Sequence, residues 1–106
     1  MFVVHPKRFA VVKTDTKPND FFAIVKTGDC LTAIIPEEDV NESFLEYEKG
    51  FRLITIIRPL SFKILKDFTV FLLSSDSADH VLIREEDLGK ALEVLKDEVR
   101  RICKRD

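Results

Sequence analysis

The stretch SSDSADHVLIREEDL, residues 74–88, decides how the C-terminal half of the sequence is interpreted. It opens with small and acidic polar residues at 74–79, which separate the apolar run 68–73 from the strand-like segment 80–83. Ser and Asp side chains hydrogen-bond to nearby backbone in turns, so this pattern predicts a β-hairpin. The same polar residues could instead hold a ligand at the end of a sheet. The residues alone leave both interpretations open.

A helix is predicted directly after this hairpin, from Glu85 onward. Its apolar residues recur at steps of three and four positions, as on the side of a helix that packs on a sheet. Acidic residues gather at its start and basic residues at its end, which is the order that the helix dipole favours. The apolar positions are Leu88, Ala91, Leu92, Leu95, Val99, Ile102 and Cys103.

The first half of the sequence predicts further strands. Residues 8–13 (RFAVVK) are β-rich and precede the turn-like sequence DTKPND, which favours an opening strand. Apolar runs at 21–26 and 30–35 flank the three residues TGD and predict a second hairpin. Residues 51–57 (FRLITII) are typical of a central strand, which Pro59 ends because proline has no N–H for the ladder.

The segment between these strands is expected to contain one short helix at 37–49. Asn41 is a candidate N-cap and Gly50 a candidate stop, although the apolar residues of this segment have mixed spacing. Residues 61–67 favour no particular element. No linker, low-complexity segment or clear repeat is visible in the sequence.

Composition narrows the classes of function. A chain of 106 residues that is 45% hydrophobic is expected to form one domain with its own core. A net charge of −2 and a pI near 5.7 lack the basic surface of a nucleic-acid-binding protein, so no nucleic-acid partner is expected. No apolar run approaches the ~18 residues of a membrane span, and no signal peptide is visible. We therefore expect a cytoplasmic protein without a membrane partner.

The sequence contains no motif for metal binding or catalysis. His5 and His80 are far apart in the sequence and neither adjoins a cysteine, while Cys30 and Cys103 lack metal-ligand spacing. No metal is expected, and the thiols should be reduced. The sequence contains no nucleophile elbow and no phosphate-binding glycine series. It therefore predicts no cofactor and no catalytic residues, and a protein that is not an enzyme.

The sequence resembles ACT-domain proteins along nearly its whole length. The segments that carry this resemblance are PKRFAVVK, FFAIVKTGDCLTAIIPEEDV, GFRLITIIRPLSF and SSDSADHVLIREEDLGKALEVLK. It is similar to small bacterial and archaeal members related to the CASTOR arginine sensors. In the last segment, residues that match the family pattern are Ser74, Ser75, Asp79 and 85–88. Residues that depart from it are Ser77, Ala78 and His80.

The resemblance implies an α+β fold of the ferredoxin-like, ACT-like kind: an antiparallel sheet with helices on one face. Residues 1–106 would form a single ACT-like domain, with a first unit at 1–60 and a truncated second unit at 51–106 that shares the strand 51–57. Relatives carry a full helix where this chain has only residues 63–67. So short a segment spans at most ~18 Å, and a parallel crossover needs about a dozen residues. The helix of the second unit is therefore expected to be missing.

The resemblance also implies a function: a non-catalytic regulatory domain that binds a small ligand, expected to be an amino acid, at a subunit interface. The ligand-binding residues would be Ser61 and Phe62 through backbone groups, and Ser74, Ser75, Asp76 and Asp79 through side chains. The alternative is an interaction or oligomerisation module that has lost its pocket. Because the missing helix would leave apolar sheet surface bare, we expect a homodimer.

Overall fold

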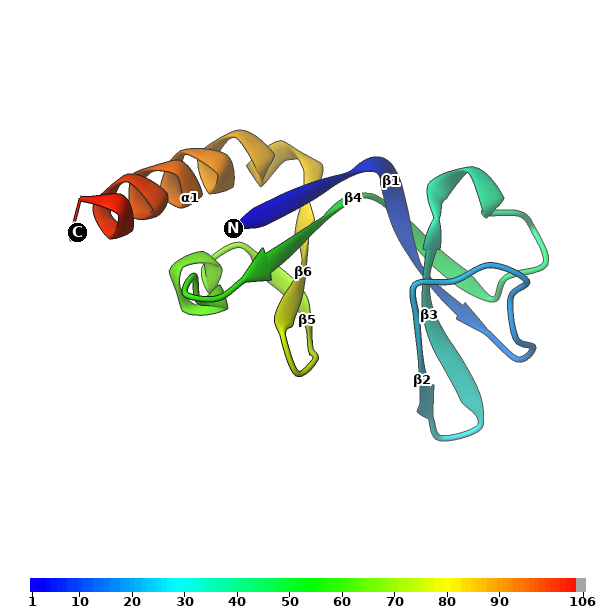
Figure 1. Ribbon diagram of the computed structural model, residues 1–106. Coiled ribbons are helices and arrows are strands. Elements are labelled where there is room, and N and C mark those ends of the chain that lie inside the picture. Colours follow the sequence, from blue (N-terminus) through cyan, green and yellow to red (C-terminus); the bar gives the residue numbers. More distant parts are fainter. Residues whose placement is uncertain (105–106) are drawn as a thin grey trace. The chain divides into compact units, whose positions relative to one another are not determined.

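The computed structural model describes residues 1–104 and shows six strands in one sheet, with an α-helix after the last strand (Figure 1). The strands are β1 (Phe2–Thr14), β2 (Ala23–Thr27), β3 (Cys30–Pro36), β4 (Glu46–Ile57), β5 (Thr69–Ser74) and β6 (Ala78–Arg84). The helix is α1 (Leu88–Cys103), and three 3₁₀ turns are η1 (Glu37–Asp39), η2 (Phe62–Leu65) and η3 (Glu85–Asp87). The predicted α+β class is confirmed, as are both hairpins and the C-terminal helix.

Hydrogen bonds join the strands in the order β2-β3-β1-β4-β6-β5. The pairs β1–β3, β2–β3 and β5–β6 are antiparallel. β1 and β4 are antiparallel as well, because Ile57 N donates to Met1 O at 2.7 Å while Leu45 N donates to Lys13 O at 2.9 Å. The chain divides into two compact units: unit 1 is Met1–Pro6 with the chain from Arg52 on, and unit 2 is Lys7–Phe51.

The two hairpins are copies of one pattern, although no clear repeat was expected from the sequence. Residues 21–40 and 69–88 align without a gap, and each consists of a strand, a turn, a second strand and a 3₁₀ turn with the sequence Glu-Glu-Asp. In unit 2, Thr27 pairs with Cys30, so the turn has two residues and not the three that were expected. In unit 1, Ser75 N donates to Ala78 O at 2.8 Å across a turn of the same length. Few side chains are identical, which is why the repeat is visible only in the structure.

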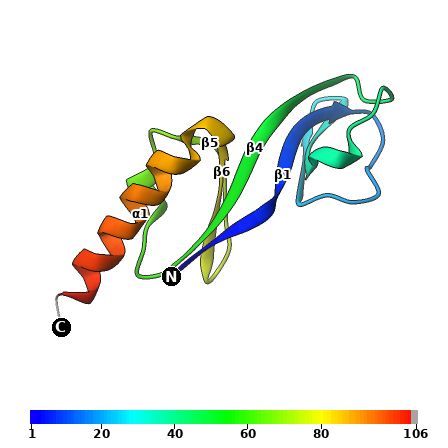
Figure 2. The same cartoon turned by 90° about the horizontal axis from the view of Figure 1, so that it is seen from above.

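In unit 1, α1 packs on the sheet and closes the core (Figure 2). Ala91 and Leu95 are fully buried with β4 and β6 residues, as the helical stripe predicted. Residues 61–67, where the resemblance implied a missing helix, contain η2, whose Leu65 is also fully buried in this core. The sheet surface that was expected to be bare on this side is therefore covered within unit 1.

In unit 2, the helix expected at 37–49 is wrong. Only Glu37–Asp39 forms a 3₁₀ turn, and the residues from Glu46 on pair as the start of β4. Asn41 caps no helix, because only turns and bends follow it before β4; its Oδ1 accepts a hydrogen bond from Ser43 N at 2.8 Å. Gly50 lies inside β4 with a φ of 90°, a conformation that favours glycine, and does not stop a helix.

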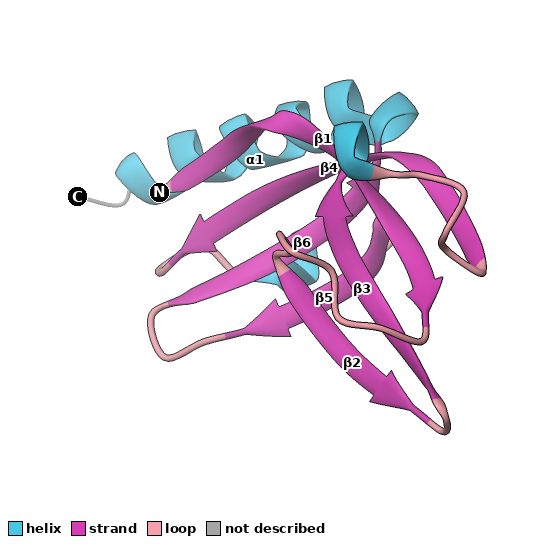
Figure 3. Cartoon of the chain, turned by 90° about the vertical axis from the view of Figure 1, so that its right-hand side faces the viewer, coloured by secondary structure: helices cyan, strands magenta, loops and turns pink. Residues whose placement is uncertain are grey.

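The helix prediction failed because β1 offers hydrogen-bond partners to the backbone of this segment. β1 extends over Phe2–Thr14 and not only 8–13, so its carbonyl groups are available to residues that follow η1. Val40 and Phe44 pack against the buried β1 and β3 residues of unit 2. Figure 3 shows the hairpin of β2 and β3 that forms the rest of this sheet.

Candidate functional site

A cavity of about 560 Å³ lies in unit 1, between the segment that follows β4 and the turn that joins β5 to β6. This volume falls within the roughly 300–1,000 Å³ typical of small-molecule sites. The residues that line it are Arg58, Pro59, Leu60, Ser61, Phe62, Ser74, Ser75 and Asp79. β4 lies beside β6 of the hairpin in the sheet. The segment that follows β4 and the turn between β5 and β6 therefore lie at the same end of these strands and can form one site.

Most of the residues that the sequence suggested for ligand binding lie around this cavity. They are Ser61, Phe62, Ser74, Ser75 and Asp79, which come from the start of η2 and from the β5–β6 hairpin. Asp76 is in the turn between β5 and β6 and does not line the cavity. The structure therefore places five suggested residues together and one apart.

The polar side chains of this cavity are ordered by hydrogen bonds of their own. Ser74 Oγ donates to Asp79 Oδ1 at 2.7 Å, and Ser75 Oγ donates to Ala78 O at 3.1 Å. Ser61 Oγ accepts from Lys63 N at 3.2 Å and so caps η2. A carboxylate has about four lone-pair directions, so Asp79 can accept further hydrogen bonds beside the one from Ser74. The Ser61 hydroxyl can still donate its own hydrogen.

Arg58 is the lining residue that sequence reasoning missed. It lies between Ile57, the last residue of β4, and Pro59, and its exposed side chain brings a permanent positive charge to the cavity that Asp79 lines. Its position inside the segment GFRLITIIRPLSF, which carries the family resemblance, was the available signal. The cavity thus combines one cation, one carboxylate and three hydroxyl groups.

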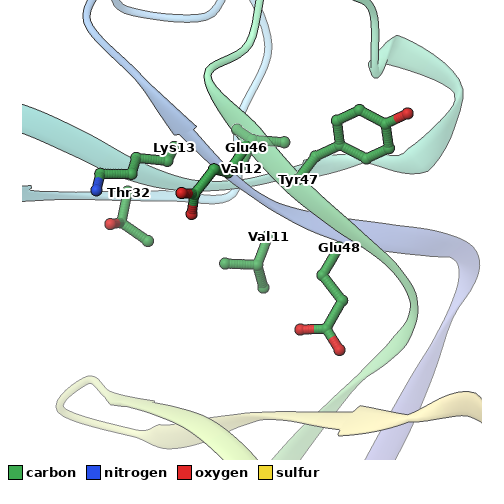
Figure 4. Close-up of a pocket in the computed structure, with 7 residues that line it drawn as sticks. All are labelled: Val11, Val12, Lys13, Thr32, Glu46, Tyr47 and Glu48. Atoms are coloured by element: carbon green, nitrogen blue, oxygen red, sulfur yellow. The ribbon is translucent and has the colours of Figure 1, made fainter.

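Unit 2 has two cavities that the sequence did not suggest. Figure 4 shows one of about 490 Å³, where Lys13, Glu46 and Glu48 bring exposed charged groups to β1 and the start of β4. The other, of about 660 Å³, is lined mainly by residues 16–20, by η1 and by the turn that follows it. Neither cavity was predicted, because the expected helix at 37–49 assigned the start of β4 and the turn before it to one element.

Within residues 1–104, no three His, Cys, Asp or Glu side chains are placed so that they could hold a metal ion. In the same part of the chain, no helix has the length and apolar character needed to cross a membrane.

Comparisons with known proteins identify the fold. No protein-family model matches the sequence, and no curated protein sequence matches it either. Among solved structures, protein Atu0741 from Agobacterium tumefaciens is similar with a TM-score of 0.67 and 16% identity, over 86% of this chain and 82% of that chain.

Two aspartokinase structures are similar as well. Aspartokinase III from E. coli, in complex with aspartate and ADP, gives a TM-score of 0.62 at 10% identity, over 91% of this chain and 32% of that chain. A structure of aspartokinase α and β subunits gives 0.62 at 13% identity, over 93% and 97%. Aspartokinase chains contain ACT domains, so the fold of this protein is ACT-like. The narrower resemblance to relatives of the CASTOR sensors is not confirmed by these matches.

Proposed function

We propose that this chain is a non-catalytic ACT-like regulatory domain that binds an amino acid in the unit 1 cavity. The observation that carries this proposal is the pair of opposite charges, Arg58 and Asp79, lining one cavity of suitable volume. A free amino acid carries a carboxylate and an ammonium group, which are the complements of these two side chains. The fold shared with aspartokinase chains, which contain ACT domains, supports the regulatory part of this proposal.

The proposed binding mode follows from the chemistry of the lining. The Arg58 guanidinium would hold the ligand carboxylate through two parallel hydrogen bonds, a geometry that lysine does not offer. Asp79 would accept a charge-assisted hydrogen bond from the ligand ammonium group. Backbone groups of Ser61 and Phe62 complete the polar contacts, and Leu60 and Phe62 give the ligand side chain an apolar surface.

Arg58→Gln and Asp79→Asn are each expected to weaken binding by about tenfold or more, because each removes a charge-assisted hydrogen bond of roughly 1.5–3 kcal/mol. A thermal-shift screen of the twenty amino acids should first identify the ligand, since a ligand at 100 times its Kd stabilises the folded state by about 2.7 kcal/mol. Calorimetric titration then measures Kd for each variant. Arg100→Gln is the matched control, because Arg100 is an exposed α1 residue that pairs with Asp97 and lies outside the cavity lining.

Two results would contradict the proposal. One is the absence of any thermal shift with amino acids at millimolar concentration. The other is an Arg58→Gln variant that binds the identified amino acid as tightly as the Arg100→Gln control does.

A second candidate function is an interaction module. The exposed apolar residues of unit 1 support it. Val3, Ile57 and Leu73 are 53%, 43% and 41% exposed. Antiparallel pairing places Val3 and Ile57 on one face of β1 and β4, and Leu73 pairs directly with His80 of β6. Their strand neighbours Val4, Ile56 and Leu72 pack into the core that α1 closes, so these apolar side chains lie on the opposite face. We propose that a second copy of the chain covers this face.

The homodimer is expected to be visible by sedimentation equilibrium. If the Kd of the dimer lies well below about 100 μM, the mass measured at that protein concentration should be about twice 12.2 kDa. A Val3→Lys/Leu73→Lys variant should return it to the monomer mass, because a charge on this face opposes burial. Val25→Lys, an exposed apolar residue of β2, serves as the control. A wild-type mass that stays at 12.2 kDa excludes the dimer.

A further inference from the structure

The lining of the unit 1 cavity contains two charged side chains, Arg58 and Asp79. In the proposed binding mode both are used by the charged ends of the amino acid, because Arg58 holds the carboxylate and Asp79 holds the ammonium group. The other lining residues are proline, leucine, phenylalanine and three serines, whose side chains carry no charge. The side chain of the ligand therefore has to be matched by uncharged groups.

The three serine hydroxyls of the lining differ in what they can offer to a ligand. A hydroxyl has one hydrogen to donate and two lone pairs that accept. Ser74 donates its hydrogen to Asp79 Oδ1 at 2.7 Å, and Ser75 donates its hydrogen to the backbone oxygen of Ala78 at 3.1 Å. These two oxygens can accept further hydrogen bonds while their own hydrogens are engaged. Ser61 accepts from a backbone N–H of η2 at 3.2 Å, so its hydrogen is available to a ligand.

The side-chain donors and acceptors of the cavity come from different segments. The segment that follows β4 carries the donors, which are the guanidinium of Arg58 and the hydroxyl hydrogen of Ser61. The β5–β6 hairpin carries the acceptors, which are the carboxylate of Asp79 and the hydroxyl oxygens of Ser74 and Ser75. We call these two sets the donor wall and the acceptor wall. A ligand side chain between them needs both a hydrogen-bond acceptor and a hydrogen-bond donor.

We propose that the unit 1 cavity selects amino acids whose side chain is uncharged and both donates and accepts hydrogen bonds, which are the carboxamide and hydroxyl amino acids. This inference rests on the proposed function, because it assigns the two lining charges to the two ends of an amino acid. A carboxamide donates from its NH2 group to the oxygen of Ser74 or Ser75, and its carbonyl accepts from the Ser61 hydroxyl. A hydroxyl side chain makes both kinds of hydrogen bond through one atom.

Charged side chains are disfavoured because each lining charge already holds one end of the ligand. An acidic side chain would bring a second carboxylate to Arg58, and a basic side chain would bring a second cation to Asp79. The two like charges of such a ligand repel each other, and a charge that leaves water without a partner of its own costs free energy. An unpaired charge therefore excludes a competing ligand even where its size fits.

Purely apolar side chains are disfavoured for a different reason. Leu60 and Phe62 can contact the methylene groups of glutamine or asparagine as well as those of leucine. Leucine, however, would displace water from the hydroxyls of Ser61, Ser74 and Ser75 and offer them no hydrogen bond in return. A site whose polar groups are left unpaired in this way binds the apolar analogue less tightly.

The first test is a set of calorimetric titrations with amino acids that differ in charge and hardly in shape. Glutamine is paired with glutamate and asparagine with aspartate, while serine, threonine, leucine and lysine are titrated beside them. We expect the tightest ligand to be a carboxamide or hydroxyl amino acid, and each carboxamide to bind at least about tenfold more tightly than its acid. Because salt screens distant charges, a ratio that persists from about 0.15 M to about 0.5 M salt is not caused by the net charge of −2 of the chain.

The second test adds a positive charge to the acceptor wall through Ser75→Lys. The ratio of the glutamate Kd to the glutamine Kd should fall at least several-fold, because the new ammonium group gives the acidic side chain the partner that it lacks. Ser77→Lys is the matched control, since it adds the same charge to the same turn at a residue outside the cavity lining. In this control the ratio should keep its wild-type value. Both serines are exposed, so both variants should fold.

The outcomes separate this inference from the proposed function. If an acidic, basic or apolar amino acid is the tightest ligand, or if an acid binds as tightly as its carboxamide, the selectivity inferred here is wrong while the amino-acid site stands. Equal Kd ratios in Ser75→Lys and Ser77→Lys would overturn the role of the acceptor wall. If none of the twenty amino acids binds at millimolar concentration, the proposed function fails and this inference fails with it.

Discussion

Leu95→Ala is expected to lower the free energy of unfolding by about 2–5 kcal/mol, the range for shortening a buried leucine. Leu95 is fully buried where α1 packs on β4 and β6, so the substitution removes contacts and leaves a cavity. Leu92, which is only half-buried, should cost less. Urea denaturation measures both values through the midpoint and slope of the transition.

The control for this substitution is Leu45→Ala, because Leu45 is 55% exposed and its loss should cost about 0.5 kcal/mol or less. Equal effects at Leu95 and Leu45 would mean that α1 does not pack on the sheet as described. The comparison therefore separates loss of core packing from a general effect of shortening leucine.

Leu65→Ala should be destabilising by a similar amount, about 2–5 kcal/mol, although it lies in a 3₁₀ turn of four residues. The reason is that Leu65 is fully buried in the same core as Leu95. Lys66→Ala changes the next residue, which is exposed, and should be nearly neutral. Thermal unfolding of the two variants measures the difference.

A small effect of Leu65→Ala would have a structural consequence. It would mean that η2 does not close the helix side of unit 1, and that the apolar surface there is free to associate. In that case the homodimer would use the face next to α1, and the Val3→Lys/Leu73→Lys variant would leave the dimer intact. Stability and sedimentation measurements together thus identify the face involved.

The same three residues, Glu-Glu-Asp, occur at 37–39 and 85–87, but the structures that follow them differ. At helix starts, acidic residues are stabilised by the helix dipole, and both triplets fit that interpretation. In the structure, Glu37 Oε1 accepts a hydrogen bond from Gly50 N at 3.0 Å, and Glu85 lies 3.8 Å from Arg52. Only the second triplet leads into an α-helix. Each first glutamate also binds β4, a role that no local pattern indicates.

The sequence by itself determined the elements whose signals are local. The stripe of α1 repeats within a few residues, the turns at 28–29 and 76–77 have the residue types that turns require, and the apolar runs beside them favour strands. These features depend on backbone geometry and on neighbours one or two turns away. They sufficed for the fold class and, with the family resemblance, for five residues that line the unit 1 cavity.

Only the tertiary structure decided the remaining features, because their partners are distant in the chain. The residues from Glu46 form a strand since β1 offers hydrogen bonds to them, and a strand, unlike a helix, cannot satisfy its backbone within itself. Arg58 joins Asp79, and His5 joins His80 through Thr55, when the strand order makes neighbours of segments at least 20 residues apart. Such contacts follow from sheet topology, which no local pattern of residues specifies.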